Sequence, residues 1–278
     1  MKKLGKLLVA AAFLLLVTGC SNSAAQSAKD ETVTVKLGVV GDDTDVWDDV
    51  QKRLAKEDIK LEYVKFTDYN QPNDALAQGE IDLNAFQHQF FLDNYNKEHG
   101  TDLVSIGNTV NAPLGIYSDQ LTSVEDLKNG ATVAIPNDVT NGGRALLLLQ
   151  TAGLIEVDPD KGQTPTTSDI TANKLDLKIE ELDASQTARA LADVDAAVIN
   201  SGVAVDAGFT PTKDAIYLEP VDDKARPYVN IIVSRKEDAN NKTYQKIVDA
   251  YQTKETEKVI EETSKGSSIP AWEDFGRK

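Results

Sequence analysis

Hydrophobic and polar positions recur at two different periods along the chain. Residues 32–40 (TVTVKLGVV) alternate and then become wholly apolar, which is typical of a strand that enters a buried sheet. Residues 46–56 instead carry apolar side chains at helical spacing. Segments of both kinds follow in turn. We expect strands at 59–66, 81–86, 103–110, 133–135, 175–182, 196–200, 215–218 and 228–234, and helices at 74–78, 87–98, 123–128, 185–192, 240–251 and 255–263.

Strands and helices alternate throughout, which predicts βαβ units and an α/β fold of mainly parallel sheets flanked by helices. The pattern restarts at Pro113, and two helices follow the last long strand. We therefore expect two lobes joined by two crossing segments, at residues 111–114 and 226–230. The expected division assigns residues 33–112 and 231–278 to lobe I, and residues 113–230 to lobe II.

The N-terminus has the parts of a secretory signal peptide: a start with three lysines, an uninterrupted apolar run at residues 7–17, and small residues before Cys20. The run is shorter than the roughly 20 residues of a transmembrane helix. Val17-Thr18-Gly19-Cys20 resembles the bacterial lipobox. We predict a signal peptide at residues 1–19, acylation of Cys20, and a flexible tether at residues 20–32. The alternative is an ordinary signal peptide with an incidental cysteine.

The whole chain is acidic, with 278 residues and a formal net charge of −16. Nucleic-acid binding requires basic stripes, and adhesion to anionic lipid requires clustered Lys and Arg, so the charge argues against both partners. The length allows one large or two medium domains. The single cysteine leaves no partner for an intrachain disulfide.

Residues 131–154 (ATVAIPNDVTNGGRALLLLQTAGL) combine a strand, a polar turn and a helix that stops at Gly153. Asn141 is a favourable N-cap residue and would place Arg144 in the first helical turn. A cation there opposes the helix dipole, and a bound anion would remove that conflict by accepting hydrogen bonds from the guanidinium and the free backbone N–H groups. On this stretch alone, an arginine that simply extends into solvent is an equal alternative.

Other polar and aromatic side chains directly follow predicted strands, where ligands bind in open α/β sheets, or lie in a crossing segment. Together with Asn141 and Arg144 they are Tyr69, Asn70, Phe86, Gln87, His88, Asn200 and Asn230. An arginine for a carboxylate, asparagine carbonyls for an ammonium and aromatic rings for an apolar side chain suit a small zwitterion. Each residue alone has an ordinary alternative as a turn, core or helix-capping residue, and only their shared position favours a site.

Other chemistries lack the residues that they need. A hydrolase requires a Ser–His–acid or Cys–His arrangement, but the chain has two histidines, its cysteine is assigned to the lipid, and no G-x-S-x-G occurs. The H-E-x-x-H, C-x-x-C, P-loop and G-x-G-x-x-G motifs are also absent. We therefore expect no catalytic residues, no metal and no cofactor. A non-transport surface lipoprotein or adhesin stays open as an alternative.

Several motifs occur in a recognisable order along the mature chain. They are FTDY at 66–69 with Pro72-Asn73, NAFQH at 84–88, IPND at 135–138, RALLLLQ at 144–150, AVIN at 197–200 and PYVN at 227–230. Together with the signal peptide and lipobox, they resemble the NlpA/MetQ family, the methionine-binding lipoproteins of ABC importers. The resemblance covers essentially the whole mature chain.

The resemblance implies a two-lobed periplasmic-binding-protein fold of type II that closes on L-methionine or a close relative. It implies that Arg144 holds the ligand carboxylate, that Asn200 and Asn230 hold its polar backbone groups, and that further site residues complete the pocket. These further residues are Tyr69, Phe86 and His88 around the side chain, and Asn141 beside Arg144. The implied partners are an ABC permease and its ATPase.

The implied protein is a monomer, anchored by its lipid to the outer face of the bacterial cytoplasmic membrane. One departure concerns selectivity: Phe90-Phe91 stand where the family often has Pro-Tyr, so a phenol hydroxyl is lost. The D-enantiomer, a methionyl dipeptide or another amino acid therefore stay open as alternative ligands.

Overall fold

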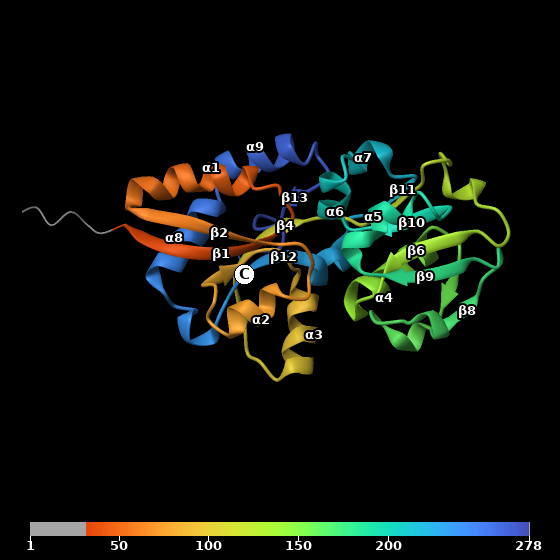
Figure 1. Ribbon diagram of the computed structural model, residues 1–278, viewed down its shortest axis with the longest axis horizontal. Coiled ribbons are helices and arrows are strands. Elements are labelled where there is room, and N and C mark those ends of the chain that lie inside the picture. Colours follow the sequence, from red (N-terminus) through yellow and green to blue (C-terminus); the bar gives the residue numbers. More distant parts are fainter. Residues whose placement is uncertain (1–31, 278) are drawn as a thin grey trace, which may run out of the picture. The chain divides into compact units, whose positions relative to one another are not determined.

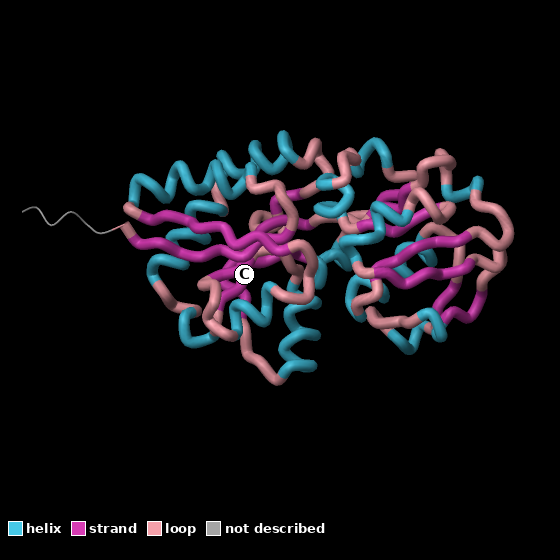
Figure 2. Tube along the Cα trace, in the orientation of Figure 1, coloured by secondary structure: helices cyan, strands magenta, loops and turns pink. Residues whose placement is uncertain are grey.

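The computed structural model describes residues 32–277, which form one compact unit (Figures 1 and 2). The predicted signal peptide, acylated Cys20 and almost all of the predicted tether lie outside the described residues. Within the described chain, the α-helices are α1 (Asp45–Leu54), α2 (Pro72–Ala77), α3 (Gln89–His99), α4 (Val139–Thr151), α5 (Thr187–Ala190), α6 (Ser201–Asp206), α7 (Pro211–Asp214), α8 (Lys242–Tyr251) and α9 (Lys254–Thr263). Short 3-10 helices include η2 (Val124–Asp126), where a longer helix was expected, and η6 (Asp223–Tyr228).

The first sheet has six strands in the order β13-β4-β12-β3-β1-β2 in the described part of the chain. These strands are β1 (Val33–Val40), β2 (Ile59–Phe66), β3 (Leu83–Asn84), β4 (Val104–Asn111), β12 (Val229–Ser234) and β13 (Ile269–Pro270). β1 pairs in parallel with β2 along its whole length, from Val33 opposite Ile59 to Val40 opposite Phe66. Both strands therefore end at the same edge of the sheet, beside the segment that contains Tyr69.

The second sheet has the order β11-β5-β10-β6-β9 among the described residues. Its strands are β5 (Gly115–Tyr117), β6 (Thr132–Pro136), β9 (Lys178–Leu182), β10 (Ala196–Ile199) and β11 (Tyr217–Leu218). A separate two-stranded pair, β7 (Glu156–Val157) with β8 (Ile170–Ala172), lies between α4 and β9 in the chain. The second sheet is thus built wholly from residues 115–218.

The fold is two-lobed and α/β, as predicted, but the expectation of mainly parallel sheets is wrong because both sheets are mixed. β1, β2 and β3 pair in parallel, as do β6, β9 and β10, whereas β4, β5, β11, β12 and β13 pair antiparallel. The reason is the return of the chain. β4 leads out of the first sheet and β12 leads back into it, so the two strands run in opposite directions when they pair.

The chain passes between the sheets at residues 112–114 and again at 219–228. We propose a division into lobe I at residues 33–112 and 231–278 and lobe II at residues 113–230, which follows these sheets except that Val229 and Asn230 already belong to β12 of the first sheet. Val229 already pairs with Asn111 at the junction.

Each sheet is covered by helices on both faces (Figure 1). In lobe I, α1, α8 and α9 supply one apolar core, which includes Trp47 and Ile247, and α2 and α3 supply a second, which includes Leu76 and Leu92. In lobe II, the apolar run of α4 packs on one face of the sheet, and residues around α5 and α6 pack on the other. This burial explains why the central strands are apolar at nearly every position.

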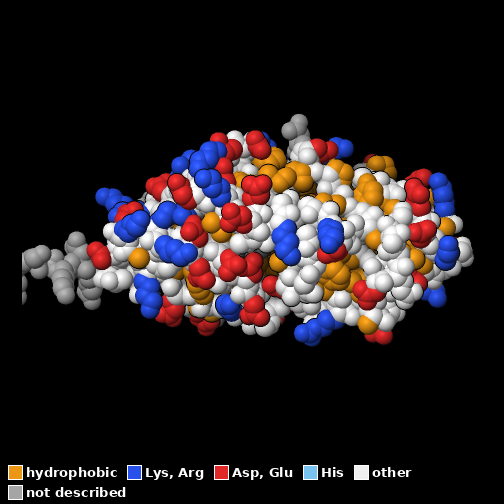
Figure 3. Space-filling view, turned by 90° about the horizontal axis from the view of Figure 1, so that it is seen from above, with side chains coloured by type: hydrophobic (Ala, Val, Ile, Leu, Met, Phe, Trp, Pro, Cys, Tyr) orange, Lys and Arg blue, Asp and Glu red, His pale blue; other side chains and the backbone are white. Residues whose placement is uncertain are grey.

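The described surface carries many charged side chains, and acidic and basic groups are mixed on the face shown in Figure 3. Among residues 32–277, no helix combines the length and the apolar character that crossing a bilayer would require.

Candidate functional site

A cavity of about 210 Å³ lies between the two lobes and receives side chains from both. Of the nine residues that the sequence singled out, Asn70 does not line this cavity, whereas the seven that the family resemblance implies as ligand-binding all do: Tyr69, Phe86, His88, Asn141, Arg144, Asn200 and Asn230. The other lining residues are Val40, Ala85, Gln87, Phe91, Ala112, Ser201, Gly202, Val203 and Asp206. The strand-end argument therefore identified a set of residues that the fold does bring together.

Three aromatic rings from lobe I form one wall of the cavity. The ring of Phe86 lies 5.9 Å from that of Tyr69 and 5.8 Å from that of Phe91, and the Tyr69 and Phe91 rings are 6.3 Å apart. These are ordinary spacings for tilted and edge-on aromatic pairs. Burial raises the pKa of Tyr69, so its hydroxyl stays protonated. The wall suits an apolar or polarizable ligand group.

His88 caps the helix that follows it and also faces the cavity. Its Nδ1 accepts a hydrogen bond from the backbone N–H of Phe91, at 3.0 Å, at the start of α3. Burial and the nearby Arg144 charge lower the His88 pKa to about 3. The imidazole is therefore neutral at pH 7, and because Nδ1 accepts, Nε2 carries the proton. Nε2 has no hydrogen-bond partner among the described residues, so it can donate to a ligand.

The start of helix α4 differs from the prediction. α4 begins at Val139, and Asp138 is its N-cap, accepting a hydrogen bond from the backbone N–H of Asn141 at 2.9 Å. Arg144 consequently lies in the second helical turn, not the first. Asp138 and Asn141 are both good capping residues, but Asn141 instead points its carbonyl at Asn200.

Arg144 is not an unpaired cation, because an acidic side chain of the same protein already neutralises it. Its side chain is only 4% exposed and forms a two-pronged ion pair with Glu219, with 2.9 Å between Nε and Oε1 and a second bond from Nη2 to Oε2. Nη2 also donates to the carbonyl of Ala112, at 3.1 Å, and the guanidinium lies 4.2 Å from the centre of the Tyr228 ring. These contacts fix its position before any ligand arrives.

Arg144 nevertheless keeps donors for a ligand. Its Nη1 group makes no hydrogen bond within residues 32–277, while the side chain lines the cavity. Glu219 balances the arginine charge and His88 is neutral. A ligand with no net charge, such as a zwitterion, therefore suits this end of the cavity better than a bare anion, which would add an unbalanced charge in a buried place.

Asn141 and Asn200 form a carboxamide pair on the lobe II side. The Nδ2 group of Asn200 donates to Oδ1 of Asn141 at 2.8 Å, and Nδ2 of Asn141 donates to Asp138. The Oδ1 atom of Asn200 is buried without a partner in the described chain. It is an acceptor of the kind that a ligand ammonium requires.

Asn230, predicted to lie in a crossing segment, is instead the second residue of β12 and so lies in the first sheet directly after the crossing. Its backbone forms a β-bridge with His88, and the next residue, Ile231, donates from its N–H to the carbonyl of Gln87 at 3.0 Å. The start of β12 is thereby fixed directly against the segment that carries Phe86 and His88. Asn230 and His88 both line the cavity and are joined by this bridge.

The sequence argument missed residues that support or complete the site. Glu219 and Tyr228 hold Arg144, and Phe91 and Asp206 line the cavity. Glu219 directly follows β11, so the strand-end criterion could have found it. For Tyr228 and Phe91, the only signal in the sequence was their position in the family motifs. Of the Phe90-Phe91 pair, Phe91 is the residue that lines the cavity. Among the described residues, no group of His, Cys, Asp and Glu is arranged to hold a metal ion.

Two α/β lobes around a buried cavity with polar and aromatic walls define a two-lobed ligand-binding protein. The family model described as "NlpA lipoprotein" matches residues 35–272, and the chain belongs to this family.

Among similar proteins, the "Probable D-methionine-binding lipoprotein MetQ" of Vibrio cholerae is 41% identical over 95% of this chain and 96% of its own. A nutrient-binding protein of Burkholderia cenocepacia, solved bound to methionine, is 45% identical with a TM-score of 0.81, over 85% of this chain and 99% of that chain. The substrate-binding protein of a methionine transporter from Streptococcus pneumoniae is 44% identical with a TM-score of 0.82, over 86% and 96%.

Proposed function

We propose that this protein is the lipid-anchored receptor of an ABC importer and that it binds methionine. The observation that carries the proposal is that the cavity combines polar atoms without partners in the described chain and an aromatic wall. The polar atoms are two donors, Nη1 of Arg144 and Nε2 of His88, and one acceptor, Oδ1 of Asn200. The aromatic wall consists of Tyr69, Phe86 and Phe91. A zwitterionic head group with a thioether side chain matches both features.

The roles follow from the available atoms. The Nη1 group of Arg144 holds the ligand carboxylate, and Nε2–H of neutral His88 adds a further donor. Oδ1 of Asn200 and the side chain of Asn230 hold the ammonium and other polar backbone groups. Asn141 orients Asn200 through their shared hydrogen bond. Tyr69, Phe86 and Phe91 surround the thioether, where sulfur–aromatic contacts are favourable.

The size of the cavity favours one amino acid over a longer ligand. At about 210 Å³ it is smaller than the roughly 300–1,000 Å³ of pockets that take drug-sized ligands. A methionyl dipeptide would have to extend out of it toward the cleft mouth. The loss of a phenol hydroxyl at Phe90-Phe91 leaves the aromatic wall without that polar group, which fits an apolar side chain.

Ligand capture occurs by hinge closure in this proposal. Because the cavity takes side chains from both lobes, a ligand that contacts both stabilises the closed arrangement over the open one. The permease and its ATPase then receive the ligand from the closed form. The protein binds and releases without a catalytic step, and acylated Cys20 holds it at the outer face of the membrane.

A thermal-shift screen across L- and D-methionine, the other amino acids and methionyl dipeptides tests the proposal. A ligand at 100 times its Kd stabilises the folded state by about 2.7 kcal/mol, which for a domain of this size raises Tm by roughly 5–10 °C. We expect the largest shift with methionine. A larger shift with another amino acid or a dipeptide would replace the ligand, and the absence of any shift would favour a surface lipoprotein that does not transport.

The anchor is tested separately by mass and fractionation. We expect wild-type protein to carry acyl chains on Cys20 and to partition with membranes, and the Cys20→Ser protein to be released. A Cys20→Ser protein that stays membrane-bound would contradict acylation as the anchor.

A further inference from the structure

Three buried carboxamides in lobe I make a closed hydrogen-bonded ring next to the aromatic wall. Asn73 lies in the first turn of α2, Asn84 ends β3, and Gln87 lies between Phe86 and His88. Their exposed fractions are 1%, 0% and 3%. Polar side chains this deeply buried are retained only where their hydrogen bonds are made, so the ring has a defined geometry.

The ring is closed by four bonds. Asn73 and Gln87 bond reciprocally, with 2.8 Å from Nδ2 to Oε1 and 2.6 Å from Nε2 to Oδ1. Gln87 also donates to Oδ1 of Asn84 at 2.9 Å, and Asn84 donates back to Oδ1 of Asn73 at 2.9 Å. Each carboxamide therefore both donates to and accepts from another member. A substitution at any one position leaves a buried donor or acceptor on the other two without its partner.

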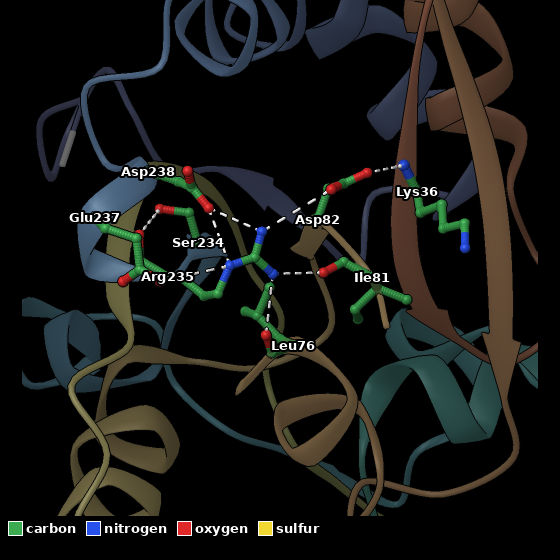
Figure 4. Close-up of polar contacts among 8 residues, drawn as sticks. All are labelled: Lys36, Leu76, Ile81, Asp82, Ser234, Arg235, Glu237 and Asp238. Atoms are coloured by element: carbon green, nitrogen blue, oxygen red, sulfur yellow. Dashed lines mark hydrogen bonds and ion pairs between the residues drawn. The ribbon is translucent and has the colours of Figure 1, made fainter. Parts of the chain in front are cut away.

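The ring connects segments that the sheet does not hold together. The segment that carries Tyr69 ends at α2, where Asn73 lies, and β3 is only two residues long, so Phe86 and His88 lie beyond it. The other end of the α2–β3 segment is held separately by Arg235, which donates to the carbonyls of Leu76 and Ile81 (Figure 4). The end nearest the cavity depends on the amides.

We propose that Asn73, Asn84 and Gln87 are positioning residues that set the spacing of Tyr69, Phe86 and His88 and thereby the affinity for the ligand side chain. The proposal rests on the proposed function for its ligand but not for its geometry. The side chains of the three amides hydrogen-bond to one another, Asn84 also donates to the Pro72 carbonyl, and of the three only Gln87 is among the residues that line the cavity.

The test compares affinity at a temperature where every variant stays folded, because a purely structural role lowers Tm but leaves the Kd of folded protein unchanged. In Gln87→Met, the donor and acceptor of Asn73 and Asn84 lose their partner. We expect its Kd for methionine, measured by calorimetry, to rise by about tenfold, which is 1.4 kcal/mol. In Asn73→Leu/Asn84→Leu/Gln87→Met, the whole ring is apolar and no amide is orphaned, so stability recovers while the raised Kd persists.

Asn96 supplies a matched control in the same lobe. It accepts hydrogen bonds from Thr101 and from the backbone N–H of Leu103, and donates to the Leu103 carbonyl at 2.8 Å, at the opposite end of α3 from His88. Asn96→Ala removes a comparable carboxamide network and should lower Tm. Its Kd should match that of wild type.

A second measurement needs no ligand. The chain contains two histidines, His88 at the ring and His99 near Asn96. In NMR spectra of the ligand-free protein, the ring variants should shift the imidazole signals of His88 and leave those of His99 in place, and Asn96→Ala should do the reverse.

The outcomes separate the two proposals. Absence of methionine binding by wild type would contradict the proposed ligand, and the His88 signals would still decide the role of the ring. Ring variants with wild-type affinity and unshifted His88 signals would overturn the positioning role. A ring variant and Asn96→Ala that weaken binding equally would overturn it as well, because the effect would then be one of general stability.

Discussion

Lobe II contains a buried arginine and lobe I a half-buried one, and the two arginines are held in different ways. Arg235 in lobe I bonds to Asp238, to two backbone carbonyls and to a second acid, Asp82, so its fork is surrounded by acceptors (Figure 4). Arg144 in lobe II is less exposed, at 4% of its side chain against 18%, yet its Nη1 group has no acceptor within residues 32–277.

The difference distinguishes a structural arginine from a binding one. Arg235 uses its donors to tie β12 to the segment before β3, and nothing is left to offer a ligand. Arg144 is fixed on one side by Glu219 and Ala112 while its remaining donors belong to the cavity wall. Burial alone does not identify a site. A buried charge with a neutralising partner and spare donors does, because its desolvation is already compensated in the ligand-free protein.

The largest expected effect on ligand affinity comes from removing the Nη1 donors of Arg144. Arg144→Ala should weaken methionine binding by about 2–5 kcal/mol, because the ligand carboxylate loses its charged partner in a buried place and Glu219 is left unpaired. Calorimetry at pH 7 measures the change. Unchanged methionine binding in this variant would contradict the assignment of Arg144.

The second prediction concerns His88 beside Arg144, whose pKa is lowered first by burial and then by the Arg144 charge. The unfolded-state pKa of histidine is near 6.5 and that of folded His88 is about 3, so the unfolded state binds a proton first as the pH falls. Stability is therefore lost below pH 6.5, by about 2–3 kcal/mol at pH 4.5 at 1.36 kcal/mol per pH unit. Urea unfolding of wild type and His88→Asn, which keeps a helix-capping side chain, isolates this part. Equal acid sensitivity of the two proteins would show that His88 is not the group responsible.

The third prediction is the reverse case, a stability effect without a binding effect. Arg235→Ala should lower the free energy of unfolding by about 1–3 kcal/mol, because several hydrogen bonds to a charged group are lost. Its affinity for methionine should stay near that of wild type. A variant that folds stably but binds weakly would remove the distinction between the two arginines.

The smallest effect on ligand affinity is expected from the loss of the Asn200 Oδ1 acceptor. Asn200→Ala removes one unpaired carbonyl and the bond to Asn141, so methionine affinity should fall by about 0.5–1.5 kcal/mol. The matching change Asn173→Ala removes a carboxamide of the same lobe that bonds to the backbone of Leu177 and lies outside the cavity lining. It should leave affinity nearly unchanged, and equal losses at both positions would argue against a direct ligand contact by Asn200.

Local pattern was enough to predict the gathering of the site. Tyr69 and Phe86 follow strands of the first sheet, and Arg144 and Asn200 follow strands of the second. Parallel strands with short connections bring their carboxyl ends to one edge within each sheet. The same reasoning predicted two lobes and the ordinary role of His88 as a helix cap, which the structure shows alongside its place in the cavity. The ligand contacts themselves stay predictions.

The local sequence pattern did not predict the structure correctly where two residues could each cap a helix, or where the interacting segments are far apart in the chain. Residues 138–141 contain two suitable N-caps, and the helix begins after Asp138 because Asn141 is engaged by Asn200 from a separate segment. β12 lies between β3 and β4 and pairs antiparallel with both, because of the direction in which the chain returns to the first sheet. The periodicity of side chains within a strand does not predict that direction.

The sequence by itself therefore determined the elements, the two-lobed α/β class and the residue types of the site, because side-chain periodicity and strand-end chemistry are local properties. Only the tertiary structure decided the charge state of that site. Glu219, 75 positions beyond Arg144 in the chain, turns an apparent lone cation into half of a neutral pair with donors to spare. The pairing forms within lobe II, where Glu219 directly follows β11, and its physical reason is the cost of burying an uncompensated charge.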